Sequence, residues 1–192
     1  MRLYPASRLA VEYALLKFHY ARTIVNPQFA FTVLDDNDNF CGVICYGVGG
    51  APFLGDKFHL APGRWIELQR VALNGGHGST SQAIGLSLKL LHKYRPCIKL
   101  VISYADKMQG HKGTVYQATN WYYLGVQARG VKKYYDPVHK KYVHQRGIKK
   151  GKLYQIEKTL GKHKYIYCLD KSLEPMIKSM SLPYPKEEEK RD

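Results

Sequence analysis

The sequence predicts a mixed α/β fold in which a central, twisted sheet is flanked by helices. Two observations carry this expectation. Short runs of strand character alternate along the chain with segments of helical periodicity. Their order (helix, hairpin, strand, helix, strand, helix, strand, long excursion, strand) is typical of α/β folds. With 192 residues and 45% hydrophobic content, the chain can also bury one core as a single domain.

The N-terminal part is expected to form a helix and a hairpin. Ser7 has the side chain of an N-cap, and the apolar residues after it predict a helix over 7–18. Two apolar runs, 29–34 and 40–47, are predicted strands. The Asp-Asp-Asn-Asp-Asn segment between them has the composition of a turn, which indicates that the two strands pair.

Residues 64–73 are expected to form the next strand, with alternate side chains on opposite faces. One face would carry Trp65, Glu67, Gln69 and Val71, and the other Ile66, Leu68, Arg70 and Ala72. A glycine-rich turn, 74–80, then leads into a predicted helix at 81–94. The later elements are a buried strand, a short helix, two further strands and a last helix, at 98–104, 112–120, 121–126, 165–170 and 173–180.

We expect one domain over 1–182, a basic arm at 129–152 and a disordered tail at 183–192. No run of 18 apolar residues predicts a membrane span, and the N-terminus lacks the apolar core of a signal peptide. The four cysteines have no zinc-site spacing. Buried free thiols in a reducing cytosol are the interpretation that we prefer.

The basic arm concentrates the positive charge of the chain. Lys and Arg number 30 against 15 Asp and Glu, a net charge of +15, and the arm has nine of these cations against one acid, Asp136. Three tyrosines, Tyr134, Tyr135 and Tyr142, lie among them. Since cations bind phosphates and aromatic rings stack on bases, we expect the arm to bind double-stranded DNA. The alternative is a solvated loop kept basic for solubility. The expected contacts are Lys132, Lys133, Lys140, Lys141, Arg146, Lys149 and Lys150.

The segment 103–125 gathers polar groups where packing alone does not require them. Asp106 and His111 are expected in the loop after a buried strand, and Tyr116 and Asn120 one turn apart on the helix that follows. Carboxylate, imidazole and phenol groups at the end of a buried strand are typical of a functional site.

This segment, read as S-Y-A-D-x-x-x-G-H-x-G-x-x-Y-x-A-x-N-W-x-Y-x-G, resembles the bacteriophage Mom proteins. Two further blocks agree in order and spacing: His19-Tyr20 after the first helix, and Trp65 to Arg70 on the predicted strand. The resemblance covers roughly residues 7–185. It implies a GNAT-like (N-acyltransferase) fold, and a transferase that modifies adenine N6 in phage DNA with a carbamoylmethyl group. Such an enzyme protects the DNA from restriction and acts in the host cytoplasm.

The resemblance also implies roles for particular residues. Asp106 is our candidate for the base that removes the N6 proton; the alternative is a helix cap. Tyr116 matches the tyrosine acid of GNAT enzymes, or else packs in the core. Glu67 and Arg70 come from the second block, where Arg70 would bind an anion or pair with a carboxylate. Ser103 and Tyr104 are expected to orient the adenine or a metal-bound water.

The transferred group raises the question of a metal and of a donor. A carbamoylmethyl group is bonded through carbon, so transfer from an acyl thioester alone would give the wrong product. His19, Tyr20 and Asp106 are ligand types suited to iron, although a His-Tyr pair after a helix is often structural. The donor would be acetyl-CoA or another small molecule. Its pyrophosphate would lie on the glycine-rich turn, at Gly75, Gly76, Gly78 and Ser79, although this turn departs from the usual GNAT pattern.

Two other function classes remain open at this point. A conventional acetyl-CoA-dependent N-acetyltransferase acting on a protein, a small amine or RNA would use the glycine-rich turn. A DNA-binding protein with an inactive enzyme fold would explain the charge but would leave Asp106, His111 and the His19-Tyr20 pair without a purpose.

Overall fold

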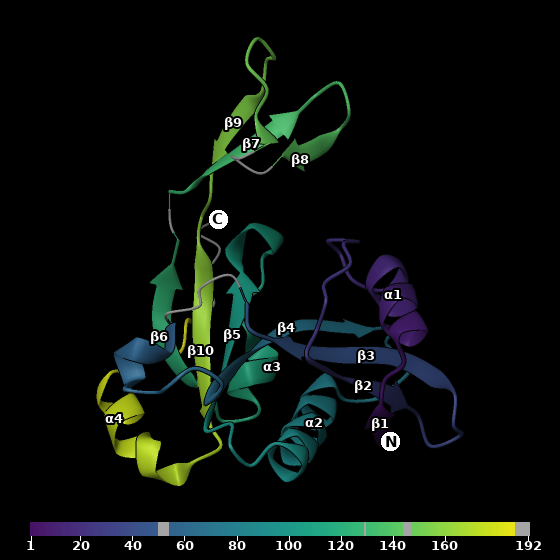
Figure 1. Ribbon diagram of the computed structural model, residues 1–192, viewed down its shortest axis with the longest axis vertical. Helices are drawn as coiled ribbons and strands as arrows, with labels where there is room; N and C mark the ends of the chain where they lie inside the picture. Colours follow the sequence, from purple (N-terminus) through teal and green to yellow (C-terminus); the bar gives the residue numbers. More distant parts are fainter. Residues whose placement is uncertain (50–53, 129, 144–146, 187–192) are drawn as a thin grey trace.

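The computed structural model describes residues 1–49, 54–128, 130–143 and 147–186, apart from the side chains of Leu54 and Lys141. Its main element is a seven-stranded sheet of order β1-β2-β3-β4-β5-β10-β6 (Figure 1). The strands in that order are Arg2–Pro5, Phe29–Leu34, Phe40–Gly47, Trp65–Leu73, Leu100–Asp106, Lys162–Cys168 and Tyr122–Gln127. None of the described helices is both long and apolar enough to cross a membrane.

The helices cover both faces of this sheet. The α-helices are α1 (Arg8–Lys17), α2 (Thr80–Tyr94), α3 (Thr114–Gln117) and α4 (Glu174–Ser179). The 3-10 turns are η1 (Leu54–Phe58), η2 (Lys107–Gln109) and η4 (Lys171–Leu173). The helices α1 and α2 pack on opposite faces of β3 and β4, around Cys45 and Ile44 respectively (Figure 1). This is the predicted architecture of a mixed sheet between helices.

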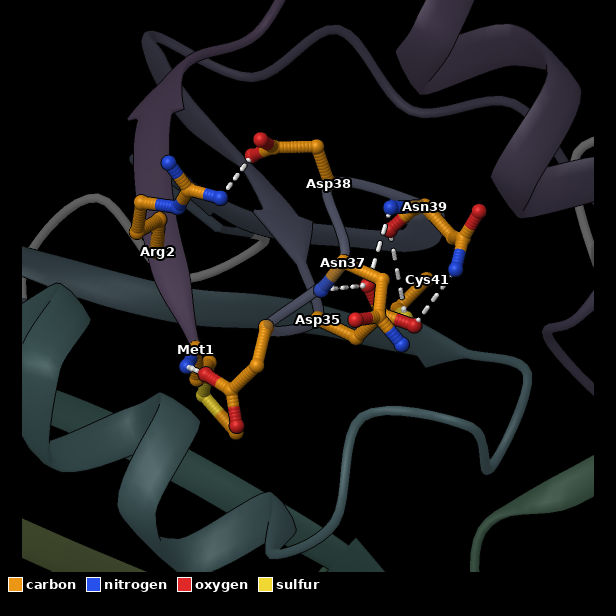
Figure 2. A network of polar contacts seen from close by, with 8 residues as sticks. Met1, Arg2, Asp35, Asn37, Asp38, Asn39 and Cys41 are labelled. Atoms are coloured by element: carbon orange, nitrogen blue, oxygen red, sulfur yellow. Dashed lines mark hydrogen bonds and ion pairs between the residues drawn. The ribbon is translucent and has the colours of Figure 1, made fainter.

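The first helix and hairpin confirm the expectation, and the hairpin turn also holds the N-terminus. Ser7 caps α1, accepting the N–H of Ala10. Figure 2 shows that Asp35 organises the turn by accepting from the amides of Asn37 and Asn39 at 2.8 and 2.9 Å. Arg2 pairs with Asp38 of the same turn. The sequence did not predict β1, because this edge strand of four residues is mostly exposed and ends in proline.

The alternation predicted for β4 is wrong beyond Leu68, because the strand has a bulge. Cys45 pairs with Arg70 and Tyr46 with Leu68, so Gln69 has no partner across the ladder. The bulge moves Val71 onto the core face shared by Leu68, and Arg70 onto the opposite face, with Glu67. An insertion of this kind leaves no trace in a period-two pattern, but it brings Glu67 and Arg70 to one side of the sheet.

The third quarter of the chain differs in detail from the prediction. The strand β5 runs on to Asp106, which is therefore a strand residue and not a loop residue. The helix α3 is only one turn long, between Gly113 (φ +80°) and a chain reversal at Asn120 (φ +59°), so Asn120 does not share a helix with Tyr116.

The expected disorder of the tail is wrong for its first residues. The Tyr184 hydroxyl donates to the carbonyl of Trp121 at 2.8 Å, and the Tyr184 ring lies 6.5 Å from that of Tyr165. The segment is held because its tyrosine docks on an aromatic cluster. Residues 187–192 lie outside the described part of the chain.

The basic excursion between β6 and β10 folds into a small sheet of its own. Its order is β8-β7-β9, with strands Lys141–Val143, Lys132–Asp136 and Gln155–Lys158. In Figure 1 this sheet stands beyond the ends of β5 and β10 as a separate projection. The arm is thus a folded element, which the sequence did not predict.

Candidate active site and nucleic-acid interface

The candidate active site lies where β4 and β5 part. These parallel strands pair from Trp65–Leu100 to Leu68–Ser103, and both continue beyond the last pair. A pocket of about 490 Å³ lies beside this opening. Its walls come from β4, β5, the loop after α1, the start of α2 and the segment that leads into α3. The lining residues are Tyr20, Val71, Thr80, Tyr104, Ala105, Asp106, Gly110, His111, Lys112, Gly113, Thr114, Val115 and Tyr116.

Asp106 is the acidic residue of this pocket. One of its oxygens accepts the backbone N–H of Met108 at 3.0 Å, which caps η2. The capping interpretation is therefore correct, yet it uses one oxygen of a half-buried carboxylate that also lines the pocket. Burial, and after it the negative charge of Asp106, raises the pKa of the Tyr20 phenol, and Arg70 opposes the shift. The structure thus places a carboxylate and a phenol together in one cavity.

Tyr116 and Ser103 form a buried polar pair beneath the pocket. The Ser103 hydroxyl lies 2.8 Å from the Tyr116 oxygen and 2.9 Å from the Leu68 carbonyl, so its single proton can serve one of the two. The Tyr116 ring packs against Trp121 and Tyr165, at centroid distances of 5.0 and 5.2 Å. Burial raises the pKa of Tyr116, which therefore keeps its proton near neutral pH, as an acid must.

Tyr20 reaches the pocket from the loop after α1, with His19 beside it. The two rings lie 4.4 Å apart, and the Tyr20 ring meets that of His111 edge-on at 5.6 Å. Burial lowers the pKa of His19 to about 4, with further contributions from the nearby charges of Arg70 and His111. His19 is therefore a neutral, buried imidazole, and only Tyr20 of the pair lines the cavity.

These residues do not fit a metal ion as they are arranged. The His19 Nδ1 accepts the N–H of Ala21 at 3.1 Å, so the neutral ring carries its proton on Nε2 and has no free lone pair. The guanidinium of Arg70 also acts on His19, and a second positive charge there is unfavourable. Among the residues that the structure describes, no three His, Cys, Asp or Glu side chains form a metal-binding group, and the predicted set has only two such side chains, His19 and Asp106.

Glu67 and Arg70 lie next to the pocket's phenols without lining the pocket. Burial raises the pKa of Glu67, although Lys162 and Arg70 oppose the shift. Burial and the Glu67 charge together raise the pKa of Tyr104 to about 12. Arg70 donates from Nη1 to the carbonyl of Gln69 at 2.7 Å. Within the described ranges Arg70 forms no ion pair with Glu67 or Asp106, and its Nε is buried without a partner.

The glycine-rich turn adjoins the pocket at one residue. Thr80, the first residue of α2, lines the cavity, and its hydroxyl oxygen lies 2.9 Å from Nε2 of His77. Gly75 and Gly78 have φ of +88° and +79°, and a Cβ at either would meet only open space. Gly76 donates its N–H to Asn74, and the Ser79 hydroxyl caps α2 at Gln82. The glycines thus leave room above the N-terminus of α2, which suits an anionic group.

The arm presents its cations to solvent and contacts the loop that follows Asp106. Lys133 is half-buried, with its Nζ 3.4 Å from the sulfur of Met108. This contact brings β7 next to η2 and so places the arm beside the pocket. The other described cations of the predicted set are exposed, namely Lys132, Lys140, Lys149 and Lys150. Arg146 lies outside the described residues, as does the side chain of Lys141.

Three contributors to this site were missed by sequence reasoning. Lys112 and Thr80 line the pocket. Tyr165 lies on β10 and holds the segment 107–113, which we call the pocket loop. Its hydroxyl donates to the Lys112 carbonyl at 2.5 Å and accepts from Gln117 at 3.0 Å. A tyrosine in a buried strand and a lysine in a charged loop carry no local signal. The one available signal was for Lys112, which directly follows His111 in the polar segment.

Comparisons with known proteins identify the family and the fold. The family model described as the Mom protein family matches residues 2–186. A curated relative, the methylcarbamoylase mom of Escherichia phage Mu, is 31% identical over 111 residues, which cover 56% of this chain and 46% of the relative. The aligned part is thus less than half the length of that relative.

Among solved structures, a dodecameric spermidine N-acetyltransferase of Vibrio cholerae has a TM-score of 0.53 at 11% identity, covering 91% of this chain and 96% of that one. A structure of this Vibrio cholerae enzyme in complex with CoA and spermine has a TM-score of 0.51 at 9% identity, covering 87% and 94%. These likenesses confirm the GNAT-like fold. With the family match over nearly its whole length, the chain belongs to the Mom protein family.

Proposed function

We propose that this protein is a transferase that modifies DNA, placing a carbamoylmethyl group on N6 of adenine. The observation that carries the proposal is the pocket at the end of β5, lined by Asp106, Tyr20, Tyr104 and Tyr116, with the basic arm fastened beside it through Lys133 and Met108. The family relation to the methylcarbamoylase of phage Mu supports the substrate and the group. The modification would protect phage DNA from restriction inside the host cytoplasm.

The acceptor chemistry explains the need for such a pocket. The N6 amine of adenine is conjugated with the ring and paired in the duplex, so the base must leave the helix before it reacts. A flipped adenine then needs a stacking surface and a group that takes the N6 proton as the new bond forms. The phenols of Tyr20 and Tyr104 offer the first, and Asp106 offers the second.

The remaining polar residues would supply an acid and would position the groups around Asp106. Tyr116 remains protonated and has Ser103 beside it, which suits a proton donor for the leaving group. Glu67 and Arg70 would act as positioning residues, through their charges on Tyr104 and on His19 and Tyr20. His19 would orient Tyr20 by stacking and would not act as a base, because its pKa is lowered to about 4.

The donor would be a small molecule that enters where β4 and β5 part. The turn with Gly75, Gly76, Gly78 and Ser79 would receive its anionic part at the start of α2, next to Thr80. A CoA thioester fits the fold. Transfer of its acyl group to N6 would, however, give an amide and not the carbon-bonded carbamoylmethyl product. No step is assigned to iron, because His19 has no lone pair free in this arrangement.

A conventional N-acetyltransferase is the second candidate, favoured by the divergence of β4 and β5 above a glycine-rich turn. It would leave the arm without a purpose. The two candidates differ in the mass that they add, which makes them separable in one experiment.

The test is mass spectrometry of nucleosides from plasmid DNA of bacteria that express the chain. We expect deoxyadenosine heavier by a carbamoylmethyl group, and its absence with Asp106→Ala. Asp170→Ala is the matched control, because Asp170 caps η4 two residues after the end of β10, as Asp106 caps η2 from the end of β5. An increase by the mass of an acetyl group would instead support the N-acetyltransferase. Unmodified deoxyadenosine with folded protein present would reject the proposal.

A further inference from the structure

The turn between β7 and β8 is held rigid by one buried carboxylate. Asp136 is only 5% exposed. Its Oδ1 accepts the backbone N–H groups of Val138 and His139 at 3.0 and 3.1 Å, and its Oδ2 lies 2.8 Å from Nδ1 of His139. Pro137 restricts the backbone further. A turn with so many fixed contacts keeps its tip in one position.

The first half of this turn, Pro137 and Val138, is apolar. Val138 is 81% exposed; the arm also exposes cations and other apolar side chains such as Leu153 and Ile156, and what distinguishes Val138 is its place in the turn fixed by Asp136. A β-branched side chain has few rotamers, so it loses little entropy on insertion between other groups. Two exposed cations belong to the same hairpin: Lys140 is the last residue of the turn, and Lys132 is the first residue of β7. The hairpin therefore combines a stiff apolar point with groups that bind phosphate.

The hairpin is anchored to the pocket and stiffened at its base. Lys133 joins β7 to Met108, two residues beyond Asp106. The Tyr135 and Tyr142 rings pack across the two strands at 5.2 Å, and the Lys133 ammonium lies over the Tyr142 ring at 5.6 Å. In Figure 1 the β7–β8 turn lies at one side of the arm, on the same side of the view as α1. The turn thus has a fixed place relative to the pocket.

We propose that Val138 is the wedge that enters the DNA stack and holds the space left by the adenine that flips into the pocket. This inference rests on the proposed function. Proteins that bend or open a duplex insert apolar side chains between base steps, and flipping a base costs unstacking and unpairing energy that a side chain inserted in the gap can offset. The exposed lysines would hold phosphates while the wedge enters.

The test uses the purified full chain and a duplex with 2-aminopurine in place of the target adenine, in a plasmid sequence that the protein modifies. The fluorescence of this base rises when it leaves the stack, and its amino group is on the wrong carbon to be modified. We expect a rise with the natural protein, and a rise reduced at least about fivefold with Val138→Ala, while the affinity changes less than about threefold. Val138→Leu should restore the signal.

Leu153→Ala is the matched control, because Leu153 is 90% exposed elsewhere in the arm. It should leave the fluorescence unchanged. An undiminished signal in Val138→Ala, or an equal loss in Leu153→Ala, would overturn the wedge, and so would a natural protein that binds the duplex without any rise. Absence of modified deoxyadenosine in the cellular assay would instead reject the proposed function itself.

Discussion

The pocket loop and the β7–β8 turn begin with the same local motif and have different surroundings. Each follows a strand whose last residue is an aspartate, Asp106 in β5 and Asp136 in β7. Each carboxylate accepts the N–H two residues on, at 3.0 Å. In the turn, His139 occupies the other oxygen. In the pocket, Asp106 instead lies near the Tyr20 phenol, within a cavity. The motif fixes the carboxylate, and its neighbours decide whether it can take part in chemistry.

Asp106→Asn should have the largest effect on activity. The amide oxygen can still accept from Met108, so the cap of η2 remains, whereas the base is lost. We expect DNA modification to fall by about 10²–10⁴-fold, with an unchanged melting temperature and an unchanged affinity for duplex DNA. The measurement is the modified fraction of deoxyadenosine in cells.

Asp170→Asn tests whether this loss is specific. Asp170 accepts from Ser172 at 3.0 Å in the equivalent cap, but it pairs with Lys99 and does not line the pocket. Its substitution should leave modification unchanged. Full activity in Asp106→Asn would reduce Asp106 to a structural cap like Asp136.

The sequence predicted the elements of the domain better than it predicted the geometry of the site. Helix and strand periods follow from local apolar spacing, which is why α1, α2 and the β2–β3 hairpin begin and end close to their predicted residues. The bulge at Gln69 cannot be read from such spacing, because the same residues satisfy either phase. It nevertheless decides that Glu67 and Arg70 share a face.

Four of the candidate residues line one pocket, but the residues that support them were not predicted. Asp106, Tyr104 and Tyr116 come from the polar segment and Tyr20 from the family resemblance, and all four meet in the pocket. Tyr165, which holds the pocket loop, lies far along the chain on β10. Contacts over such a separation depend on strand order, which local patterns do not specify. For the same reason the arm was predicted as a basic excursion and not as a sheet.

A glycine pair compares the packing of the two regions. Gly113 in the pocket loop and Gly151 in the arm both have positive φ, +80° and +85°. A Cβ at Gly113 would lie 2.4 Å from the Tyr165 ring, whereas a Cβ at Gly151 would meet nothing within 4 Å. We expect Gly113→Ala to lower the free energy of unfolding by about 3 kcal/mol, from strain and overpacking, and Gly151→Ala by about 1 kcal/mol, from strain alone. Urea denaturation measures both, and equal losses would mean that the pocket loop is as loosely packed as the arm.

The buried His19 predicts how acid affects the pocket side of the molecule. Its pKa in the folded state, about 4, lies below the ordinary 6.5, so the unfolded chain binds the proton more readily between these values. Stability is complete above pH 6.5 and declines as the pH falls towards 4. By pH 5 the His19 contribution should have fallen by about 2 kcal/mol.

His19→Asn separates this contribution from that of other groups. The asparagine oxygen can accept from Ala21 as Nδ1 does, but it does not titrate. The difference between the free energies of unfolding at pH 7 and pH 5 should be smaller in the variant by about 2 kcal/mol. An identical pH dependence in both proteins would mean that His19 is as accessible to protons in the folded state as in the unfolded state.

The smallest effect is expected in the arm, where single exposed charges act by counterion release rather than by placing a reacting atom. Lys132→Ala removes one cation from β7, and Lys178→Ala removes one from α4 as a matched control for total charge. In fluorescence titrations at several salt concentrations, Lys132→Ala should weaken duplex binding severalfold and reduce the slope of log K against log [salt] by about 0.9, whatever the DNA sequence. Lys178→Ala should change neither. Modification at saturating DNA should persist in both variants, since neither residue lines the pocket. Equal effects of the two substitutions would mean that DNA responds to the net charge of the protein. The arm would then not be a specific DNA-binding surface distinct from the pocket.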